Sequence, residues 1–212
     1  MDWKKRLLRS FNLYAVTDLK SSDRDVIDSI ERALRGGADV VQLRSKSLPD
    51  SEFLRVGAAV RKMTRKYKRL FIVNDRLDLM LVLQADGVHL GQEDLPITAV
   101  RKLTGRHYIL GSSTHNFAQA IEAEKSGADY VGFGPIFATP TKADYAPVGL
   151  NEIRRVSAAL KIPVVCIGGV NHRNVTAVRN AGGRRIAVVR AIFGAPDPAE
   201  AARRLKEKMG VT

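Results

Sequence analysis

The chain has 212 residues, of which 45% are apolar and 27% charged, and its 35 Lys and Arg against 22 Asp and Glu give a formal net charge of +13. This composition is typical of a globular protein and excludes the collagen, coiled-coil and disordered classes. The single cysteine, Cys166, excludes an internal disulfide, no segment reaches the roughly 18 apolar residues of a membrane-spanning helix, and no signal-peptide core follows the basic N-terminus, so we expect a cytoplasmic protein without a membrane partner.

Short apolar runs alternate along the chain with segments of helical periodicity. We expect eight strands, at residues 13–17, 40–44, 70–74, 87–90, 109–113, 130–133, 164–167 and 186–189. We expect helices at residues 25–35, 52–66, 79–83, 97–103, 116–125, 151–160 and 198–209. Buried strands separated by helices are typical of a parallel sheet, because parallel neighbours need crossover connections.

A repeated pattern, in which small residues end a helix and a strand follows, occurs four times. It precedes the second, fourth, sixth and eighth strands, as GGADVVQL, QADGVHL, SGADYVGF and AGGRRIAV. Asp39, Asp86 and Asp129 mark its register. Four copies of a unit of two βα pairs predict an α/β fold, a (βα)8 TIM barrel. The alternative is an open doubly wound sheet, which usually has a glycine-rich loop after its first strand, and this chain has none there.

We expect a single barrel domain over residues 1–212, with the barrel proper at about 13–209 and a short extension at 1–12. The runs of cations at residues 61–69 and 203–208 lie in helical segments, so we interpret them as solvated helix faces. The alternative, a basic nucleic-acid-binding module, lacks an aromatic-interleaved basic stripe or a zinc-finger spacing. We therefore expect no nucleic-acid partner.

Catalytic groups of this fold gather at the carboxyl ends of the strands. After the second strand, Gln42, Arg44 and Lys46 alternate with apolar residues, so an extended chain presents all three on one face. Two cations and an amide there suit a polyanion such as a diphosphate, and an ion-paired barrel rim is the alternative.

Asp75 follows Asn74 after the third strand, and Asp94 follows the fourth. Carboxylates that leave neighbouring strands can share one ion, and hard oxygen ligands beside phosphates favour Mg²⁺. Alternatively, both aspartates are helix N-caps.

Ser113 and His115 follow the fifth strand. A Ser–His nucleophile pair has little support, because the two residues lack a third group. A hydroxyl that hydrogen-bonds a leaving group is the better interpretation, and a helix cap by Ser113 or Thr114 is the alternative.

The irregular stretch 134–149 follows the sixth strand and contains Thr139, Thr141 and Lys142. Long loops in compact domains are often functional, and an inert surface loop is the alternative. After the seventh and eighth strands, Gly168, Gly169, Val189 and Arg190 lie where this fold frequently holds a phosphate on backbone amides. The glycines alternatively make only a tight turn. Together the loops predict a pocket for two phosphorylated small molecules, one of them beside a metal.

The segments QLRSK, VNDR, DGVHLGQEDLP, GSSTH, GPIFATPTK, PVGL and IGGV occur in this order. From about residue 13 to 198 the chain resembles the thiamine phosphate synthase family, which is a (βα)8 barrel. The resemblance implies coupling of 4-amino-2-methyl-5-hydroxymethylpyrimidine diphosphate with a thiazole phosphate, which releases diphosphate and forms thiamine phosphate.

The resemblance also implies roles for individual residues. Catalysis would involve Lys142, Ser113 and Arg44, and Mg²⁺ would be bound by Asp75 and Asp94. Substrates would be bound by Gln42, Arg44, Lys46, Asn74, Ser113, Thr139, Thr141, Lys142, Gly169, Val189 and Arg190. Arg190 departs from the family, which often has a small residue such as Ser there.

The implied mechanism is dissociative: diphosphate leaves first, and the thiazole nitrogen captures the resulting cation. A rival is a thiazole tautomerase on the same barrel, which would use an imidazole such as that of His115. The joint presence of the pyrimidine-diphosphate groups and both aspartates argues against it. The partners expected are small-molecule substrates, and a homo-oligomer is compatible with the sequence.

Overall fold

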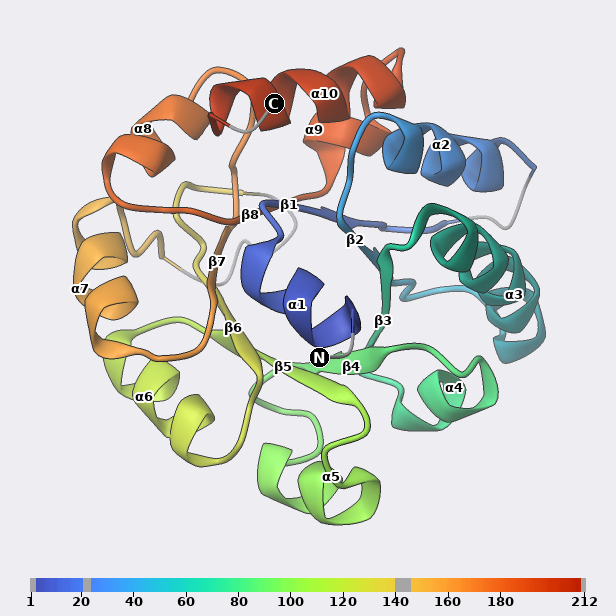
Figure 1. The fold of residues 1–212 in the computed structure, drawn as a ribbon, viewed down its shortest axis with the longest axis horizontal. Coiled ribbons are helices and arrows are strands. Elements are labelled where there is room, and N and C mark those ends of the chain that lie inside the picture. The colour runs from blue at the N-terminus through green and yellow to red at the C-terminus, as the bar shows by residue number, and fades with distance from the viewer. Residues whose placement is uncertain (1–2, 21–23, 140–145, 211–212) are drawn as a thin grey trace.

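The computed structural model describes residues 3–20, 24–139 and 146–210. Eight parallel strands form a closed barrel in chain order, with helices around it (Figure 1). The strands are β1 (Leu13–Val16), β2 (Val40–Leu43), β3 (Leu70–Asn74), β4 (Gly87–Leu90), β5 (Ile109–Thr114), β6 (Tyr130–Phe133), β7 (Val164–Ile167) and β8 (Ile186–Val188). The predicted TIM barrel in a single domain is confirmed.

The helices outside the barrel are α2 (Arg24–Arg35), α3 (Asp50–Tyr67), α4 (Leu77–Val82), α5 (Ile97–Thr104), α6 (Phe117–Lys125), α7 (Asn151–Ala159), α8 (Val175–Asn180), α9 (Arg190–Phe193) and α10 (Pro198–Lys208). The sequence analysis missed α8 and α9, which have only six and four residues, although it did predict the six-residue α4. None of the described helices is long and apolar enough to cross a membrane.

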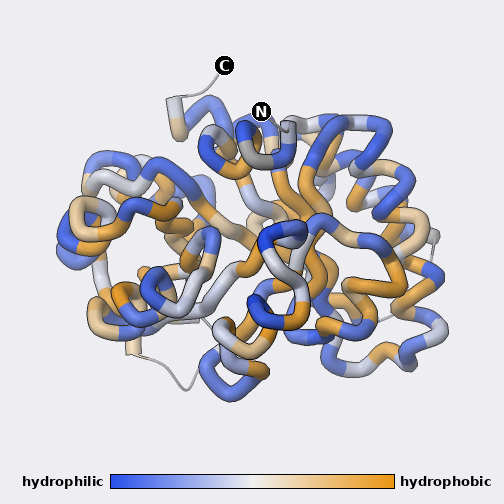
Figure 2. Tube along the Cα trace, turned by 60° about the horizontal axis from the view of Figure 1, so that its bottom comes forward, coloured by the Kyte–Doolittle hydropathy of each residue, from blue (hydrophilic) through white to orange (hydrophobic). Residues whose placement is uncertain are grey.

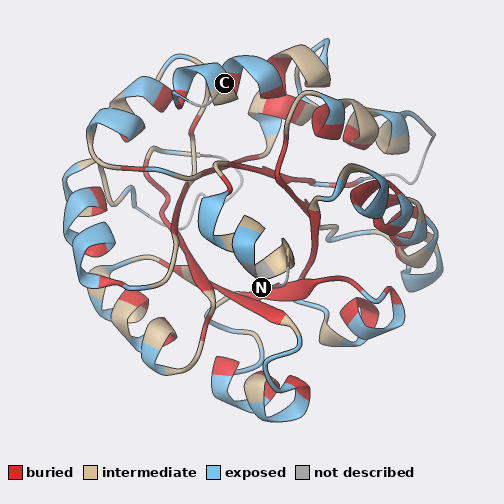
Figure 3. Cartoon of the chain, in the orientation of Figure 1, coloured by how far each residue is buried: buried red, intermediate tan, exposed pale blue. Residues whose placement is uncertain are grey.

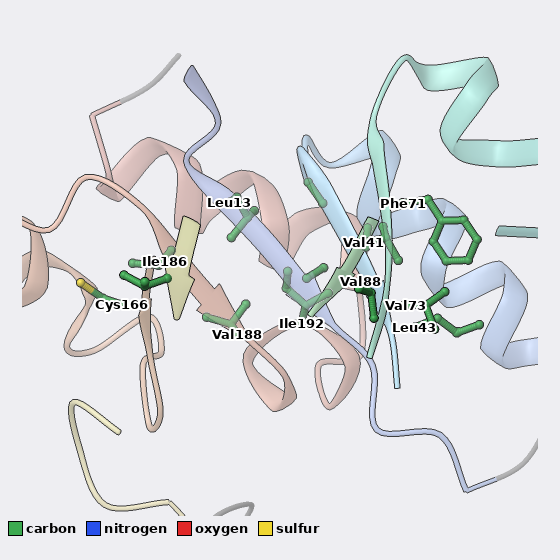
Figure 4. Close-up of a cluster of buried hydrophobic side chains, with 14 of the residues drawn as sticks. Leu13, Val41, Leu43, Phe71, Val73, Val88, Cys166, Ile186, Val188 and Ile192 are labelled. Atoms are coloured by element: carbon green, nitrogen blue, oxygen red, sulfur yellow. The ribbon is translucent and has the colours of Figure 1, made fainter. Parts of the chain in front are cut away.

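Side chains alternate along every strand between the barrel interior and the helices. Val41 and Leu43 of β2 belong to the outer core between strands and helices, whereas Val40 belongs to the inner core. Figure 3 shows the strands buried and the outward faces of the helices exposed. Figure 4 shows part of the outer core, which includes Leu13, Phe71 and Ile186, and in Figure 2 the apolar stretches run through the middle of the molecule.

A short helix, α1 (Trp3–Ser10), closes the amino-terminal end of the barrel. It lies across the centre of the ring of strands in Figure 1. Trp3, Leu7 and Leu8 of this helix pack against the inner core, which includes Phe11 and Tyr14. Because this end is plugged, ligands reach the barrel from the opposite end.

The repeated aspartates tie the amino-terminal ends of neighbouring strands together. Asp39 accepts a hydrogen bond from the backbone nitrogen of Leu13 at 3.2 Å. In the same way Asp86 accepts from Phe71 at 2.8 Å, and Asp129 from Leu110 at 2.8 Å. Each carboxylate thus joins the strand that it precedes to the strand before it. The repeat found in the sequence is therefore structural.

The interpretation of the cation run at residues 61–69 as a solvated helix face is wrong for Arg61. Its side chain is buried and pairs with the equally buried carboxylate of Asp86 at 3.0 Å. Arg69 pairs with Asp39 at 3.4 Å. Buried aspartates need cationic partners, so some of the basic residues of the chain form ion pairs with the repeat aspartates at the amino-terminal end of the barrel. In the other run Arg203 is exposed and pairs with Glu200 and Glu207, but the interpretation is wrong for Lys206, which is half-buried and pairs with Asp39 at 2.9 Å.

Candidate functional site

A cavity of about 900 Å³ opens at the carboxyl ends of the strands, within the usual size range of small-molecule sites. All of the described residues predicted for the site line it: Gln42, Arg44, Lys46, Asn74, Asp75, Asp94, Ser113, Thr139, Gly169, Val189 and Arg190. Thr141 and Lys142 lie outside the described residues. Side chains that lie 148 positions apart in the sequence, such as those of Gln42 and Arg190, therefore share one cavity.

The side chains at the exit of β2 point into the cavity as their alternation predicted. Gln42 is buried, Arg44 is half-buried and Lys46 is exposed. Arg44 forms an ion pair with Asp18, and its backbone nitrogen donates to the Thr17 hydroxyl at 2.9 Å. The ion-paired rim considered for this segment is thus present at Arg44. The pair orients a guanidinium that still borders the cavity.

Asp75 and Asp94 reach the cavity from the loops after the neighbouring strands β3 and β4. Asp75 has a left-handed backbone with φ of 60°, a conformation that costs a non-glycine residue about 1–2 kcal/mol. Its amide donates to the His89 carbonyl at 2.8 Å and so joins the two strand exits. Backbone strain of this kind clusters at functional sites.

The helix-cap interpretation of these aspartates is wrong. The residue at the N-cap of α4 is Arg76, that of α5 is Pro96, and neither helix has a side-chain cap. Asp94 instead accepts a hydrogen bond from the backbone amide of Gly91 at 2.6 Å. Both carboxylates therefore belong to the cavity wall.

The two carboxylates suit one hard cation. Among residues 3–20, 24–139 and 146–210, no group of three or more His, Cys, Asp and Glu side chains could hold a metal. A zinc-type site of several protein ligands therefore does not fit the described residues. Mg²⁺, by contrast, usually takes only one or two protein carboxylates and completes its shell with waters and phosphate oxygens. Asp75 and Asp94 fit that requirement.

A chain of hydrogen bonds between buried side chains crosses the floor of the cavity. Gln42 Nε2 donates to the Tyr14 hydroxyl at 2.8 Å, and this hydroxyl lies 2.8 Å from that of Tyr130. The Tyr130 hydroxyl lies 3.0 Å from His89 Nδ1. His89 Nε2 lies 2.9 Å from Ser113 Oγ. The chain thereby links Gln42, at the exit of β2, with Ser113, on β5.

The sequence interpretation missed Tyr14, His89 and Tyr130, although all three line the cavity. Their signal is the strand alternation, because each is an inward-facing residue with a polar end in an otherwise apolar strand. Burial raises the pKa of Tyr14 and of Tyr130 far above the ordinary value, so both stay protonated at neutral pH.

The helix-cap interpretation of Ser113 and Thr114 is also wrong. The N-cap of α6 is Asn116, whose side chain accepts from the Gln119 amide. His115 also lines the cavity. Its Nδ1 lies 2.6 Å from the Gly134 carbonyl, and because a carbonyl only accepts, Nδ1 carries the hydrogen. The Ser113 hydroxyl lies 2.9 Å from Nε2 of a different histidine, His89.

The loops after β6 and β7 pack on each other. Gly168 and Gly169 have φ of 92° and 66°, a region that strongly favours glycine. A Cβ at Gly169 would lie 2.8 Å from the Ala138 carbonyl oxygen, and Phe137 donates its amide to the Gly168 carbonyl. The glycines thus make a turn and also allow the loop that carries Thr139 to approach.

Val189 and Arg190 begin the short helix α9 after β8. The first amides of a helix have no partner within it and carry partial positive charge. Arg190 is exposed and borders the cavity at the end of β8, which only β1 separates from the β2 strand of Gln42. This rim therefore offers an anion both backbone amides and a guanidinium.

The fold and the cavity define a (βα)8-barrel enzyme with a binding site at the mouth of the barrel. A family model described as thiamine monophosphate synthase matches residues 13–192. A thiamine-phosphate synthase of Moorella thermoacetica is 47% identical over 199 residues, which cover 93% of this chain and 95% of that protein. The chain belongs to the thiamine monophosphate synthase family.

Two further comparisons agree with this assignment. A thiamine-phosphate synthase of a Synechococcus species is 44% identical over 204 residues, which cover 95% of this chain but only 58% of that longer protein. A solved structure of the thiamine phosphate pyrophosphorylase from Pyrococcus furiosus matches with a TM-score of 0.87 and 38% identity, and covers 97% of both chains.

Proposed function

We propose that the protein is a thiamine-phosphate synthase. It couples 4-amino-2-methyl-5-hydroxymethylpyrimidine diphosphate with a thiazole phosphate and releases diphosphate. The observation that carries the proposal is one cavity bordered by cations and carboxylates on one side and by glycine-rich loops and Arg190 on the other. Two anionic substrates that bind on opposite sides of a cavity meet at its centre, which converts their encounter into an intramolecular step.

In this proposal the exits of β2 to β4 hold the pyrimidine diphosphate. Gln42, Arg44, Lys46 and Asn74 bind it, and Asp75 and Asp94 would hold Mg²⁺ against its phosphates. Bound Mg²⁺ would neutralise negative charge on the diphosphate. Arg44 does the same from the protein, and its ion pair with Asp18 holds the guanidinium in place.

The thiazole phosphate lies at the opposite rim in this proposal, on Gly169 and on the backbone at Val189 and Arg190. Thr139, Thr141 and Lys142 would lie between the two substrates, where Lys142 would stabilise the departing diphosphate. The bond from the pyrimidine methylene carbon to the diphosphate oxygen breaks, and the thiazole nitrogen supplies the electron pair of the new bond. The nitrogen has a free lone pair, so no general base is needed.

The rival tautomerase has one observation in its favour, because His115 lines the cavity and its Nδ1 donates to the Gly134 carbonyl, which orients the imidazole. The residues proposed to bind the pyrimidine diphosphate line the same cavity and favour the synthase.

We place the enzyme and its small-molecule substrates in the cytoplasm.

The test is an assay with both purified phosphates and Mg²⁺. Release of diphosphate that requires both substrates, together with formation of thiamine phosphate, is the expected result. A change in the thiazole phosphate alone, without the pyrimidine substrate, would establish the tautomerase instead.

A further inference from the structure

The buried chain of hydrogen bonds from Gln42 to Ser113 can carry its hydrogens in one of two directions. In one, every hydrogen points from Gln42 toward Ser113. In the other, the hydrogens of the histidine and the two hydroxyl groups beyond Tyr14 point back toward Gln42. The direction decides whether the Ser113 hydroxyl can donate a hydrogen bond to a ligand in the cavity or instead donates its hydrogen bond to His89.

The amide of Gln42 sets the direction. An amide nitrogen only donates, so the Tyr14 oxygen accepts from Gln42 Nε2, and the Tyr14 hydrogen must go to its other neighbour, Tyr130. In the reverse direction the Tyr14 hydrogen would have no acceptor among the described residues. Tyr14 is only 2% exposed, and a buried hydroxyl hydrogen without a partner is costly.

The remaining hydrogens follow from this first one. Tyr130 accepts from Tyr14 and donates to His89 Nδ1 at 3.0 Å. The imidazole hydrogen is therefore on Nε2, which donates to Ser113 Oγ at 2.9 Å. Ser113 accepts this bond, so its own hydrogen is left for a partner in the cavity. Both phenols keep their hydrogens at neutral pH, since burial raises the pKa of Tyr14 and Tyr130.

The packing around the chain holds its members in place. The rings of His89 and Tyr130 stack at 5.4 Å between centroids with 28° between their planes. Gly111 lies directly beneath them, and a Cβ there would be 2.2 Å from Tyr130 Cζ and 2.5 Å from His89 Nδ1. At Gly132 a Cβ would lie 3.2 Å from His89 Cε1. Glycine at these two positions gives the pair the room that it occupies.

We propose that Tyr14, Tyr130 and His89 are positioning residues that hold Ser113 as a hydrogen-bond donor toward the ligand in the cavity. The imidazole stays neutral, with its hydrogen on Nε2. A serine fixed in this way selects a ligand atom that accepts, such as a phosphate or ring-nitrogen lone pair, over one that only donates. The identity of the ligand rests on the proposed function, but the tautomer of His89 follows from the hydrogen bonds alone.

The first test reads the state of His89 directly. In ¹⁵N NMR spectra of protein labelled at histidine, at pH 7, His89 is expected to have a bare Nδ1 and a protonated Nε2. The His89→Gln variant assigns the signals. His115 is the internal reference for a hydrogen-bearing Nδ1, because its Nδ1 donates to Gly134. A protonated Nδ1 on His89, whether in a neutral ring or an imidazolium, overturns the proposal.

The second test reverses the chain. In the Gln42→Glu variant an ionised carboxylate can only accept, so Tyr14 must donate to it and every later hydrogen turns round. The neighbouring Arg44 and Lys46 favour the ionised form, and the ¹³C shift of the carboxylate reports it. The His89 hydrogen is then expected on Nδ1. The unchanged wild-type pattern beside an ionised carboxylate contradicts the proposal.

The third test connects the chain to turnover through a double-mutant cycle. Tyr14→Phe is expected to lower kcat/KM for the pyrimidine diphosphate about tenfold, the size typical of one hydrogen bond. In a Ser113→Ala background the same change should have almost no further effect. If the two substitutions instead lower kcat/KM independently, so that their effects multiply in the double variant, the proposal is overturned. Tyr67→Phe is the matched control, since Tyr67 bonds Glu31 outside the barrel. Absence of turnover in the wild type would count against the synthase, while the NMR result still decides the inference.

Discussion

The carboxylate of Asp94 accepts a 2.6 Å hydrogen bond from the backbone amide of Gly91, so the loop after β4 folds back on itself beside the cavity. One carboxylate oxygen is thereby held by the loop, and Asp75 borders the same cavity from the exit of the neighbouring strand β3. Asp75 in turn has a left-handed backbone, with φ of 60°. Backbone strain of this kind clusters at functional sites, and we propose that the two carboxylates share one divalent cation.

From this pair we predict a strict need for a divalent cation. Removal of Mg²⁺ with a chelator should abolish activity, and added Mg²⁺ should restore it. Asp75→Ala should raise the Mg²⁺ concentration for half-maximal rate by about tenfold or more, a loss of the size seen when metal sites are disturbed. The measurement is initial rate against free Mg²⁺. Asp28→Ala, which removes an exposed carboxylate on α2, is the control, and full activity in chelator would remove the metal from the scheme.

We predict that Lys142→Ala slows turnover far more than it weakens binding. The lysine is proposed to stabilise charge that develops only as diphosphate departs, so kcat should fall by about 10²-fold or more while KM for each substrate changes little. Steady-state kinetics with each substrate varied in turn gives both constants. A variant with normal kcat and raised KM would instead make Lys142 a binding residue.

The barrel itself was predictable because its signals are local and repeated. Strand limits inferred from the sequence agree with the structure within a residue at each end, since each apolar run is bounded by residues that cannot continue it. The repeat marked by Asp39, Asp86 and Asp129 predicted the fold. Its structural role, which is to join adjacent strands, depends on hydrogen bonds from the backbone nitrogens of Leu13, Phe71 and Leu110. Only the folded chain brings those groups together.

The site was predictable at the carboxyl ends of the strands and unpredictable in the strand interiors. Gln42 and Asp75 come at strand ends, so the barrel geometry alone places them at the mouth. Tyr14 and Tyr130 lie in strand interiors, where tyrosine is a common residue. Nothing in the local sequence distinguishes a tyrosine that only packs in the core from one whose hydroxyl hydrogen-bonds a residue 116 positions away. Their role depends on the closure of the barrel, which joins β1 to β6 across its interior.

We predict that Arg190 contributes to binding of the thiazole phosphate but not to chemistry. Its guanidinium borders the cavity and is exposed, so Arg190→Ala should raise KM for that substrate by about three- to tenfold, as for a solvent-screened cation. Its kcat should stay near the wild-type value. Arg106→Ala removes the same charge from the loop before β5, at the other end of the barrel. An unchanged KM in the Arg190 variant would leave the phosphate to the backbone amides alone.

We predict that Asp86→Ala destabilises the fold without altering the site. The Asp86 carboxylate is fully buried and pairs with Lys4 at 2.8 Å and Arg61 at 3.0 Å. Its loss leaves a buried guanidinium unpaired, which costs about 3–5 kcal/mol. Denaturant unfolding should report this loss, whereas Asp28→Ala should lie within about 0.5 kcal/mol of the wild type. The kcat/KM of the folded variant should be unchanged, because Asp86 lies at the closed end of the barrel.

We predict that Gly111→Ala damages both stability and activity through one steric overlap. An added methyl would lie 2.2 Å from Tyr130 Cζ and 2.5 Å from His89 Nδ1, and such overpacking of a core costs about 1–3 kcal/mol. Relief requires the stacked rings to move apart, which breaks the bond between them and lowers kcat/KM. Chemical denaturation and steady-state kinetics measure the two losses. Gly105→Ala is the control, because its φ of 58° and ψ of −148° bring backbone strain while the nearest atom is 3.6 Å away, so it should lose stability of about 1–3 kcal/mol and keep full activity. A Gly111→Ala enzyme with full activity would mean that the two rings can shift without consequence, and that the reaction does not depend on the packing of His89 against Tyr130.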